Sequence, residues 1–320
     1  MHILFYGYGS HAKKIKSCCD EFFILKEKPI YSGIRRSKTE TDIEIYHSIE
    51  EVLSKKSEID CVFITANNSN HLNIFKKCIE KEIKFIYVEK PAIGVQNFFK
   101  NCPLELTEKI KYIQIGYHMA YAEAFIKLKD IIDSQKFGEL TRFDFFLGHG
   151  LAFKESFEKT WRSKEKFALI ETLLCHLINI SIYLKDLDSF NNLNSISKLN
   201  EINKKKDTEH ITFTTNDGAL FSLTASWGSP LEKSAKAYFS NGIWEYDFQK
   251  TTLKYPRDNF DSKGFFIPPM KKTYNCEFLG IRPSIFYFLE QVKKNKFKMH
   301  EFNNSDQTNF VIENIKGKYF

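Results

Sequence analysis

Two glycines and a small residue near the N-terminus have the spacing of a phosphate-binding loop. Gly7, Gly9 and Ala12 fit the pattern G-x-G-x-x-A, directly after an apolar run at 2–6 that predicts a strand. Glycine permits the tight turn and lets the backbone approach a pyrophosphate, and a small third residue lets helix and strand pack closely. Ser10 and His11 would open the helix, whose first N–H groups bind phosphates. The pattern therefore predicts a dinucleotide site.

The residues after the second predicted strand indicate which dinucleotide to expect. Domains that prefer NAD place Asp or Glu here to bind the ribose 2′-hydroxyl. In this chain the strand at 29–34 leads into Arg35 and Arg36, with no carboxylate. Ser32 and the two arginines suit a 2′-phosphate through charge-assisted hydrogen bonds. We therefore expect NADP(H), with NAD(H) as the alternative. The competing interpretation is that the arginines are ordinary exposed loop cations.

Two further strand ends are expected at the same edge of the sheet. One carries Asn67 and His71, and the next carries Glu89 and Lys90, followed by Pro91. Ligands of doubly wound sheets bind at the carboxyl ends of the strands. Lys90 would then lie beside a nicotinamide and a substrate hydroxyl. By its position alone, Lys90 could equally be an ordinary surface lysine.

Taken together, these motifs resemble the glucose-fructose oxidoreductase / inositol dehydrogenase / rhizopine-catabolism (Gfo/Idh/MocA) family. The shared features are the loop at 7–12, Asn67 to His71, Glu89-Lys90-Pro91 and Gly116-Tyr117-His118. The resemblance implies an α/β fold: an N-terminal Rossmann domain with a doubly wound parallel sheet, followed by an α+β domain with a large open antiparallel sheet. It also implies hydride transfer between NAD(P) and a hydroxyl carbon of a sugar, cyclitol or nucleotide sugar, and makes Pro91 a candidate for a cis peptide.

The resemblance also assigns roles to single residues. Lys90 and His176 would be catalytic, since histidine has an ordinary pKa of about 6.5 and is a natural base, while an ammonium group stabilises charge on the reacting oxygen. His118 or Tyr121 could supply the acid–base group instead. The residues expected to bind the cofactor are Gly7, Gly9, Ser10, His11, Ala12, Ser32, Arg35, Arg36, Asn67, His71, Glu89 and Lys90. Those expected to bind the substrate are Lys90, Tyr117, His118, Tyr121, Trp161, Arg162, Thr172 and His176.

The region around His176 departs from the family pattern. The family has Asp four residues before this histidine and often three after it, where this chain has Thr172 and Asn179. In an α-helix, Glu171 would point about 100° away from position 172, so it cannot simply replace the acid that the family has there. His176 then has an alternative interpretation as a satisfied helical histidine. The chain likewise has two alternatives: a dinucleotide-binding regulator or sensor without catalysis, or a lyase or hydrolase that uses NAD transiently.

The pattern of apolar runs predicts two domains that position these residues. Over 1–116, short apolar runs alternate with helical segments, which is typical of parallel strands covered by crossover helices. Over 117–320 the pattern is that of a substrate-binding and oligomerisation domain with antiparallel strands. Turn sequences at 216–218 and 241–242 predict two hairpins, since asparagine and glycine tolerate positive φ. Helices are expected at 122–134, 170–184 and 283–294, and a loop with one short strand at 191–207.

Composition argues against several functional classes. The 47 Lys and Arg against 40 Asp and Glu give a net charge of +7 spread along the chain, without the basic stripe typical of a nucleic-acid partner. The seven cysteines have no metal-ligand spacing and, with no signal peptide, favour a reducing cytoplasm. The apolar stretch at 168–184 contains Glu171 and His176, so no membrane span is expected.

The predicted antiparallel sheet also suggests self-association. The alternating strands at 211–215, 220–224 and 237–246 carry aromatic residues that would form one open face. Large exposed apolar patches are rare on monomers. We therefore expect a homodimer or homotetramer formed through this sheet.

Overall fold

The chain is described here from a computed structural model. The residues that it describes are 1–25, 27–35, 41–56, 58–185, 191–199, 206–255, 260–276, 280–298, 300–302 and 304–317, without the side chains of 155, 156, 161, 199 and 206. They form two compact units: Met1–His118 with Ile281–Asn309, and Met119–Gly280 with Phe310–Phe320.

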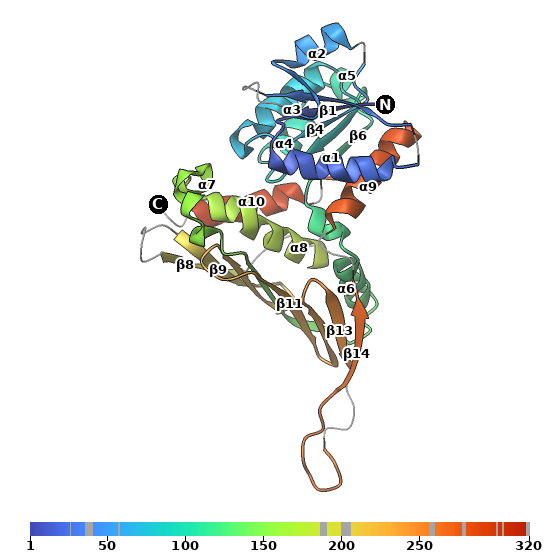
Figure 1. Cartoon of the computed structure of the whole chain (residues 1–320). Coiled ribbons are helices and arrows are strands. Elements are labelled where there is room, and N and C mark those ends of the chain that lie inside the picture. The colour runs from blue at the N-terminus through green and yellow to red at the C-terminus, as the bar shows by residue number, and fades with distance from the viewer. Residues whose placement is uncertain are drawn as a thin grey trace. The chain divides into compact units, whose positions relative to one another are not determined.

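The first unit contains a parallel sheet with six strands among the described residues, in the order β3-β2-β1-β4-β5-β6 (Figure 1). The strands are β1 (His2–Tyr6), β2 (Ile30–Ile34), β3 (Glu44–Tyr46), β4 (Cys61–Ile64), β5 (Phe85–Val88) and β6 (Tyr112–Ile115). The order reverses between β1 and β4, which is where doubly wound sheets bind ligands. The predicted Rossmann-type sheet is confirmed.

The first unit also contains helices and short 3₁₀ turns. They are α1 (Ser10–Phe22), α2 (Ile49–Lys55), η1 (Asn68–Asn70), α3 (His71–Glu80), α4 (Val95–Lys100), α5 (Leu104–Thr107) and α9 (Ile281–Lys294), with η2 (His118–Tyr121) at its boundary. Ser48 caps α2 by accepting a hydrogen bond from the Glu51 N–H at 3.2 Å. Such side-chain caps satisfy N–H groups that the helix itself leaves unpaired.

Helix α9 completes the core of this unit from a distant part of the sequence. It packs beside α1, and the Phe288 ring lies 5.1 Å from that of Phe63 on β4 and 5.5 Å from that of Tyr87 on β5. These side chains are buried in one cluster together with Ile15 of α1. The unit boundary lies close to the expected residue 116. However, residues 281–309 belong to the first unit and not with the second half of the chain.

The second unit contains a mixed sheet with eight strands among the described residues, in the order β14-β13-β12-β11-β7-β10-β9-β8 (Figure 1). They are β7 (Leu140–Gly148), β8 (Asn191–Leu199), β9 (Lys206–Thr214), β10 (Leu220–Ser226), β11 (Glu232–Phe239), β12 (Gly242–Tyr246), β13 (Lys250–Tyr255) and β14 (Met270–Asn275). The β7–β10 pair is parallel and the other recorded pairs are antiparallel. Both predicted hairpins, β9–β10 and β11–β12, are confirmed.

Helices cover one face of this sheet and leave the other open (Figure 1). Those of the second unit are α6 (Glu123–Asp133), η3 (Leu151–Phe153), η4 (Glu155–Lys159), α7 (Trp161–Lys164), the π-helix η5 (Ile170–Leu174) and α8 (Cys175–Lys185), while α10 (Ser305–Gly317) runs into it from the first unit. In the described ranges, no helix has the length and apolar character needed to cross a bilayer.

Two expectations about this sheet are wrong. Most of its aromatic residues do not lie on the open face: Phe143, Phe213, Phe221 and Trp244 are at most 1% exposed. Successive side chains of a strand point to opposite faces, so the other set, such as Ser222, lies on the open side. The expected loop over 191–207 is also wrong in part, because its first nine residues form β8. Residues 200–205 lie outside the described part.

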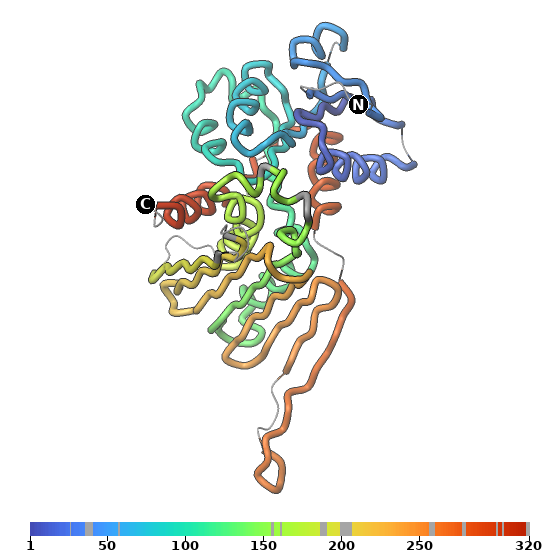
Figure 2. Tube along the Cα trace, turned by 60° about the vertical axis from the view of Figure 1, so that its left-hand side comes forward, coloured from blue at the N-terminus to red at the C-terminus, as the bar shows by residue number. Residues whose placement is uncertain are grey.

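An arm between β13 and β14 projects from the edge of this sheet (Figure 2). Phe260 and Phe266 face each other across its tip, with ring centroids 4.9 Å apart, and both rings are more than half exposed. Asp261 shapes the turn by accepting hydrogen bonds from the N–H groups of Lys263 and Phe265. The arm therefore carries strongly exposed aromatic side chains.

Candidate functional site

The first glycine of the loop is fixed by its backbone surroundings. Gly7 has a φ of +100°, and a Cβ built there would lie 2.6 Å from the backbone of Ala66 at the end of β4. Its N–H donates to the Ile34 carbonyl at 3.0 Å, and the Thr65 hydroxyl donates to its carbonyl at 2.5 Å. The turn thus connects the ends of β1, β2 and β4, and no side chain fits at Gly7.

The second glycine has a different reason to be there. Gly9 is the N-cap of α1 with a φ of −110°, which any residue can adopt, and a Cβ built there would meet nothing within 4 Å. The open space lies before the first turn of α1, where N–H groups and the helix dipole attract a phosphate. Ala12 is fully buried, so α1 packs closely on the sheet as the motif predicts. The loop therefore fits a pyrophosphate.

A crevice of about 800 Å³ begins at this loop and follows the carboxyl ends of β1, β2 and β4. Three of the predicted cofactor residues line it: Gly7, Arg35 and Asn67. Residues that the sequence analysis did not identify also line it, among them His47, Lys76 and Lys77. No motif marks these residues in the sequence. Only their positions could have indicated them, because His47 follows β3 and the lysines lie on α3, the helix that follows β4.

The residues expected around the ribose are only partly positioned for it. Ser32 is fully buried, and its hydroxyl lies 2.8 Å from Nε2 of His2, so it is not placed to contact a ligand. Arg35 directly follows β2, and its N–H donates to the Tyr46 carbonyl of β3 at 3.1 Å. Arg36 lies outside the described residues. The corrected set of cations lining the crevice is therefore Arg35 with Lys76 and Lys77.

A buried carboxylate lies beneath the phosphate loop. Glu89 is 7% exposed, and its Oε1 lies 2.9 Å from Nε2 of His11 in the first turn of α1. Burial alone would raise the pKa of Glu89, but the positive charges of His11, Lys90 and His118 lower it to about 2. The Glu89 carboxylate in turn raises the pKa of His11, against the opposing effect of burial. The carboxylate therefore favours the protonated form of His11 in the first turn of α1 and balances its charge.

Gly116 is part of the same arrangement. A Cβ built on it would lie 2.9 Å from Oε1 of Glu89 and 3.0 Å from the hydroxyl oxygen of Tyr87. A larger residue would displace the carboxylate. The glycine of the Gly116-Tyr117-His118 segment is therefore explained by the space that Glu89 needs. Tyr117 is fully buried and His118 is 8% exposed.

The turn that carries Lys90 is held by side chains from two helices. The Lys90–Pro91 peptide is cis, as the family resemblance implied. His71, the first residue of α3, is 1% exposed, and its Nδ1 lies 3.1 Å from the Pro91 carbonyl. Asn309 of α10 donates from Nδ2 to the Ala92 carbonyl at 3.2 Å. His71 is therefore engaged within the unit and not placed to contact a ligand, and Asn309 carried no signal in the sequence.

The remaining predicted substrate residues belong to the second unit. His176 lies in the first turn of α8 and is 6% exposed. The Thr172 hydroxyl donates to the Ala168 carbonyl at 2.6 Å, within its own helix. Arg162 is half-buried on α7, and burial lowers its pKa. Tyr121 is partly exposed. The Trp161 side chain lies outside the described part. Lys90 and the cofactor residues belong to the first unit.

The helix before His176 is not an α-helix throughout. Residues Ile170–Leu174 form a π-helix, in which backbone hydrogen bonds join residues five apart. The expectation that Glu171 cannot simply replace the missing acid assumed α-helical spacing, and it stays a prediction. Glu171 lies five residues before His176, and its carboxylate pairs with the Lys316 ammonium at 2.8 Å. A π turn of this kind is common at functional sites.

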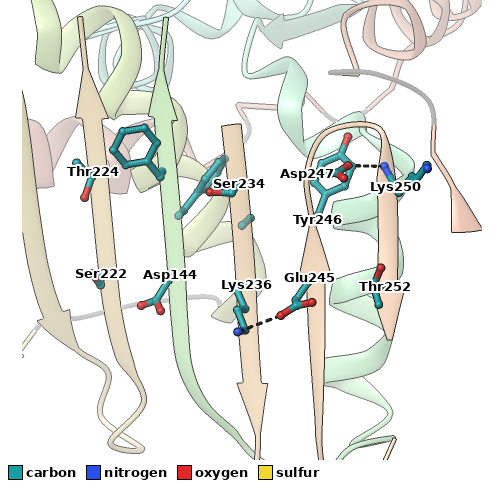
Figure 3. Close-up of a pocket in the computed structure, with 13 residues that line it drawn as sticks. Asp144, Ser222, Thr224, Ser234, Lys236, Glu245, Tyr246, Asp247, Lys250 and Thr252 are labelled. Atoms are coloured by element: carbon teal, nitrogen blue, oxygen red, sulfur yellow. Dashed lines mark hydrogen bonds and ion pairs between the residues drawn. The ribbon is translucent and has the colours of Figure 1, made fainter. Parts of the chain in front are cut away.

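A second cavity, of about 430 Å³, lies on the open face of the sheet in the second unit (Figure 3). It is polar: Asp144, Lys236 and Glu245 lie side by side on β7, β11 and β12, and the Lys236 ammonium is 3.0 Å from Oε1 of Glu245. Across the described residues, no three His, Cys, Asp or Glu side chains are grouped so as to hold a metal ion.

Comparison with known proteins identifies the same fold. Residues 25–106 match the family described as an oxidoreductase family with an NAD-binding Rossmann fold (GFO_IDH_MocA). The inositol 2-dehydrogenase of Salmonella paratyphi B is 25% identical over 144 residues, which are 45% of this chain and 40% of that protein. The matched segment thus spans two fifths of the curated relatives. The resemblance inferred from the motifs is thereby confirmed.

Solved structures extend the likeness of fold to nearly the whole chain. A levoglucosan dehydrogenase, solved with NADH and levoglucosan, has a TM-score of 0.76 at 13% identity and covers 98% of this chain and 95% of its own. An NAD-binding oxidoreductase from Klebsiella pneumoniae has a TM-score of 0.74 at 15% identity, with the same coverage. At such identities the likeness concerns the fold alone.

Proposed function

We propose, for a chain whose N-terminal part matches the NAD-binding Rossmann fold of the Gfo/Idh/MocA oxidoreductases, that it transfers hydride between a nicotinamide dinucleotide and a hydroxyl carbon of a sugar or nucleotide sugar. The observation that carries the proposal is the crevice of about 800 Å³ that begins at Gly7 and continues past Asn67. The first unit would bind the dinucleotide and the second unit the substrate.

The residues present fit such a cofactor. Gly9 leaves open the space that a pyrophosphate needs, and Glu89 favours the protonated form of His11 in the first turn of α1. The dinucleotide itself supplies the hydride acceptor or donor. The residues of this chain would bind and orient the dinucleotide and would accept or donate the proton. Lys90 would hydrogen-bond the reacting oxygen, and His176 would accept or return the proton.

NADP(H) remains the favoured cofactor in this proposal, with NAD(H) as the alternative. Arg35 lines the crevice directly after β2, and Lys76 and Lys77 add cationic groups to the lining, which also contains the carboxylate of Glu80. The 2′-phosphate of NADP(H) would pair with these positive charges, whereas the adenosine of NAD(H) has no 2′-phosphate. We also propose a role in surface-glycan biosynthesis, which rests on what is common among the resembling family. A location in the cytoplasm is proposed from the cysteine content.

Substituting Lys90 by methionine tests the proposed chemistry. We expect hydride transfer to fall by a factor of about 10²–10³, because the charge on the reacting oxygen loses its stabilising donor, while NADPH affinity changes only a few-fold. The measurement is nicotinamide absorbance after rapid mixing of the loaded protein with a panel of sugars and sugar nucleotides. Lys84→Met is the matched control, since Lys84 is half exposed and pairs with Glu58.

The same experiment separates the competing functions. Hydride transfer that is unaffected in Lys90→Met would remove Lys90 from the mechanism. Tight NADPH binding by the wild-type chain without hydride exchange for any sugar would favour the regulator or sensor, which the substitutions at Thr172 and Asn179 suggest. Turnover that proceeds without a net change in nicotinamide absorbance would favour a lyase or hydrolase.

Self-association through the open sheet face remains part of the proposal, on a different physical basis. The face carries paired charges of both signs, such as Lys236 with Glu245 and Arg142 with Asp144 at 2.8 Å, and no described helix covers it. We expect gel filtration at low salt to give a dimer or tetramer of the 37.6 kDa chain. Because such contacts are screened by salt, the assembly should weaken in high salt. A monomer at every salt concentration would contradict it.

A further inference from the structure

We propose that His71 is a positioning residue: it ties the turn that carries Lys90 to the strand end that carries Asn67, and does so completely only when its imidazole is doubly protonated. The inference rests on the proposed function, because it assumes that Lys90 and Asn67 lie in the dinucleotide site. It differs from the role first expected for His71, which was direct contact with the cofactor.

Both ring nitrogens of His71 face backbone carbonyls. Nδ1 lies 3.1 Å from the Pro91 oxygen and Nε2 lies 2.9 Å from the Ala66 oxygen, and the side chain is 1% exposed. A carbonyl oxygen only accepts hydrogen bonds, and a neutral imidazole has a single N–H to donate. In the neutral ring, one nitrogen lone pair therefore points at a carbonyl lone pair. The imidazolium form donates at both ends and satisfies both contacts.

These two carbonyls are next to residues that the proposed function places at the ligand. Ala66 precedes Asn67 at the end of β4, and both line the crevice. Pro91 directly follows Lys90 at the end of β5. Loss of either contact would let one strand end move relative to the other. His71 thus sets the distance between Lys90 and the crevice wall without touching the ligand.

Asn309 offers a neutral counterpart in the same turn. Its Nδ2 donates to the Ala92 carbonyl at 3.2 Å, one residue beyond the carbonyl that His71 holds. Two successive carbonyls are therefore held by side chains from α3 and α10. Only one of these side chains can change its protonation state, which gives an internal control for pH.

The charges around His71 determine when the tie is complete. Burial lowers its pKa; the two carbonyls and Glu89 oppose this, and Lys90 adds to the lowering. The doubly protonated form therefore becomes more populated as the pH falls below the ordinary value of 6.5. A dinucleotide bound in the crevice adds negative charge nearby, which favours the imidazolium. Binding should then take up a proton at His71.

The test compares NADPH affinity from about pH 5.5 to 8, a range that brackets histidine titration, in wild type, His71→Asn and Asn309→Ala. We expect wild-type affinity to rise toward low pH and His71→Asn to lose several-fold in affinity together with part of this slope. Asn309→Ala should lose affinity but keep the wild-type slope, because it retains His71, His11 and Glu89. Equal slopes in all three proteins would overturn the proposal.

A spectroscopic measurement keeps the test independent of catalysis and of variant stability. In the wild-type NADPH complex at about pH 6, histidine ¹⁵N spectra should show that Nδ1 and Nε2 of His71 are both protonated. His71→Gln, which keeps one donor, assigns the signal if His71→Asn does not fold. A bare nitrogen at His71 in that complex would refute the tie. If the tie is found but no sugar is oxidised or reduced, the proposed function fails and the positioning role stands.

Discussion

Gly7→Ala is expected to unfold or strongly destabilise the first unit and to abolish dinucleotide binding. A φ of +100° is strained for alanine, and the new Cβ would lie 2.6 Å from backbone atoms of Ala66, which cannot move aside as a flexible side chain can. Strain and overpacking together would cost about 2–5 kcal/mol. Denaturant unfolding measures the loss of stability, and titration with NADPH measures binding.

Gly9→Ala is the matched control for that result. Its φ is accessible to alanine and the Cβ would meet nothing within 4 Å, so the free energy of unfolding should hardly change. NADPH affinity should nevertheless fall, because the methyl group occupies the space where a phosphate would approach the N–H groups of α1. If Gly9→Ala bound NADPH as tightly as wild type, the pyrophosphate would not lie at this loop.

Glu89→Gln is expected to produce the second large effect, at the charged pair beneath the loop. The pKa of Glu89 falls from 4.5 to about 2 in the fold, which corresponds to about 3 kcal/mol of stabilisation by its charged partners. The neutral amide loses this stabilisation and leaves His11 without its counter-charge. The pKa of His11 should also move down, because the carboxylate that raises it is gone.

The sign of the pH dependence follows from the two pKa shifts. The lowered pKa of Glu89 adds stability above pH 4.5, and this is lost as the pH falls toward about 2. The raised pKa of His11 adds stability below pH 6.5, and this is lost as the pH rises through the raised value. The stability difference between wild type and Glu89→Gln should therefore be largest between pH 4.5 and 6.5.

An exposed carboxylate provides the comparison for Glu89. Glu58 pairs with Lys84 at 3.1 Å, with both side chains largely in solvent, so Glu58→Gln should change stability by less than about 1 kcal/mol. Denaturant unfolding at several pH values measures both variants. A Glu89→Gln protein as stable as Glu58→Gln across that range would show that the buried pair is not coupled as its geometry indicates.

The features that the sequence predicted well are local ones. The strand ends at Tyr6, Ile64 and Val88 follow from short apolar runs, and the loop at Gly7 follows from glycine spacing. In a doubly wound sheet these ends share one edge, so a few local motifs were enough to locate the crevice. The cis Lys90–Pro91 peptide followed from the family resemblance and not from any physical pattern in the residues.

The features that it missed depend on contacts between distant residues. Ser32 appeared available for a ribose because nothing in the sequence shows that His2 bonds to it. Asn309 holds the carbonyl after Pro91 from more than 200 residues away. The strand register, which decides whether Phe221 faces helices or solvent, shifts every side chain when it changes by one residue.

The burial of α9 against Phe63 and Tyr87 has a consequence for biosynthesis. Residues 119–280 leave the ribosome before Ile281–Lys294 is available to cover that side of the parallel sheet. Until then the nascent chain exposes a row of aromatic rings, which is the kind of surface that chaperones bind and that promotes aggregation. The unit with the parallel sheet, although most of it is encoded first, therefore matures late.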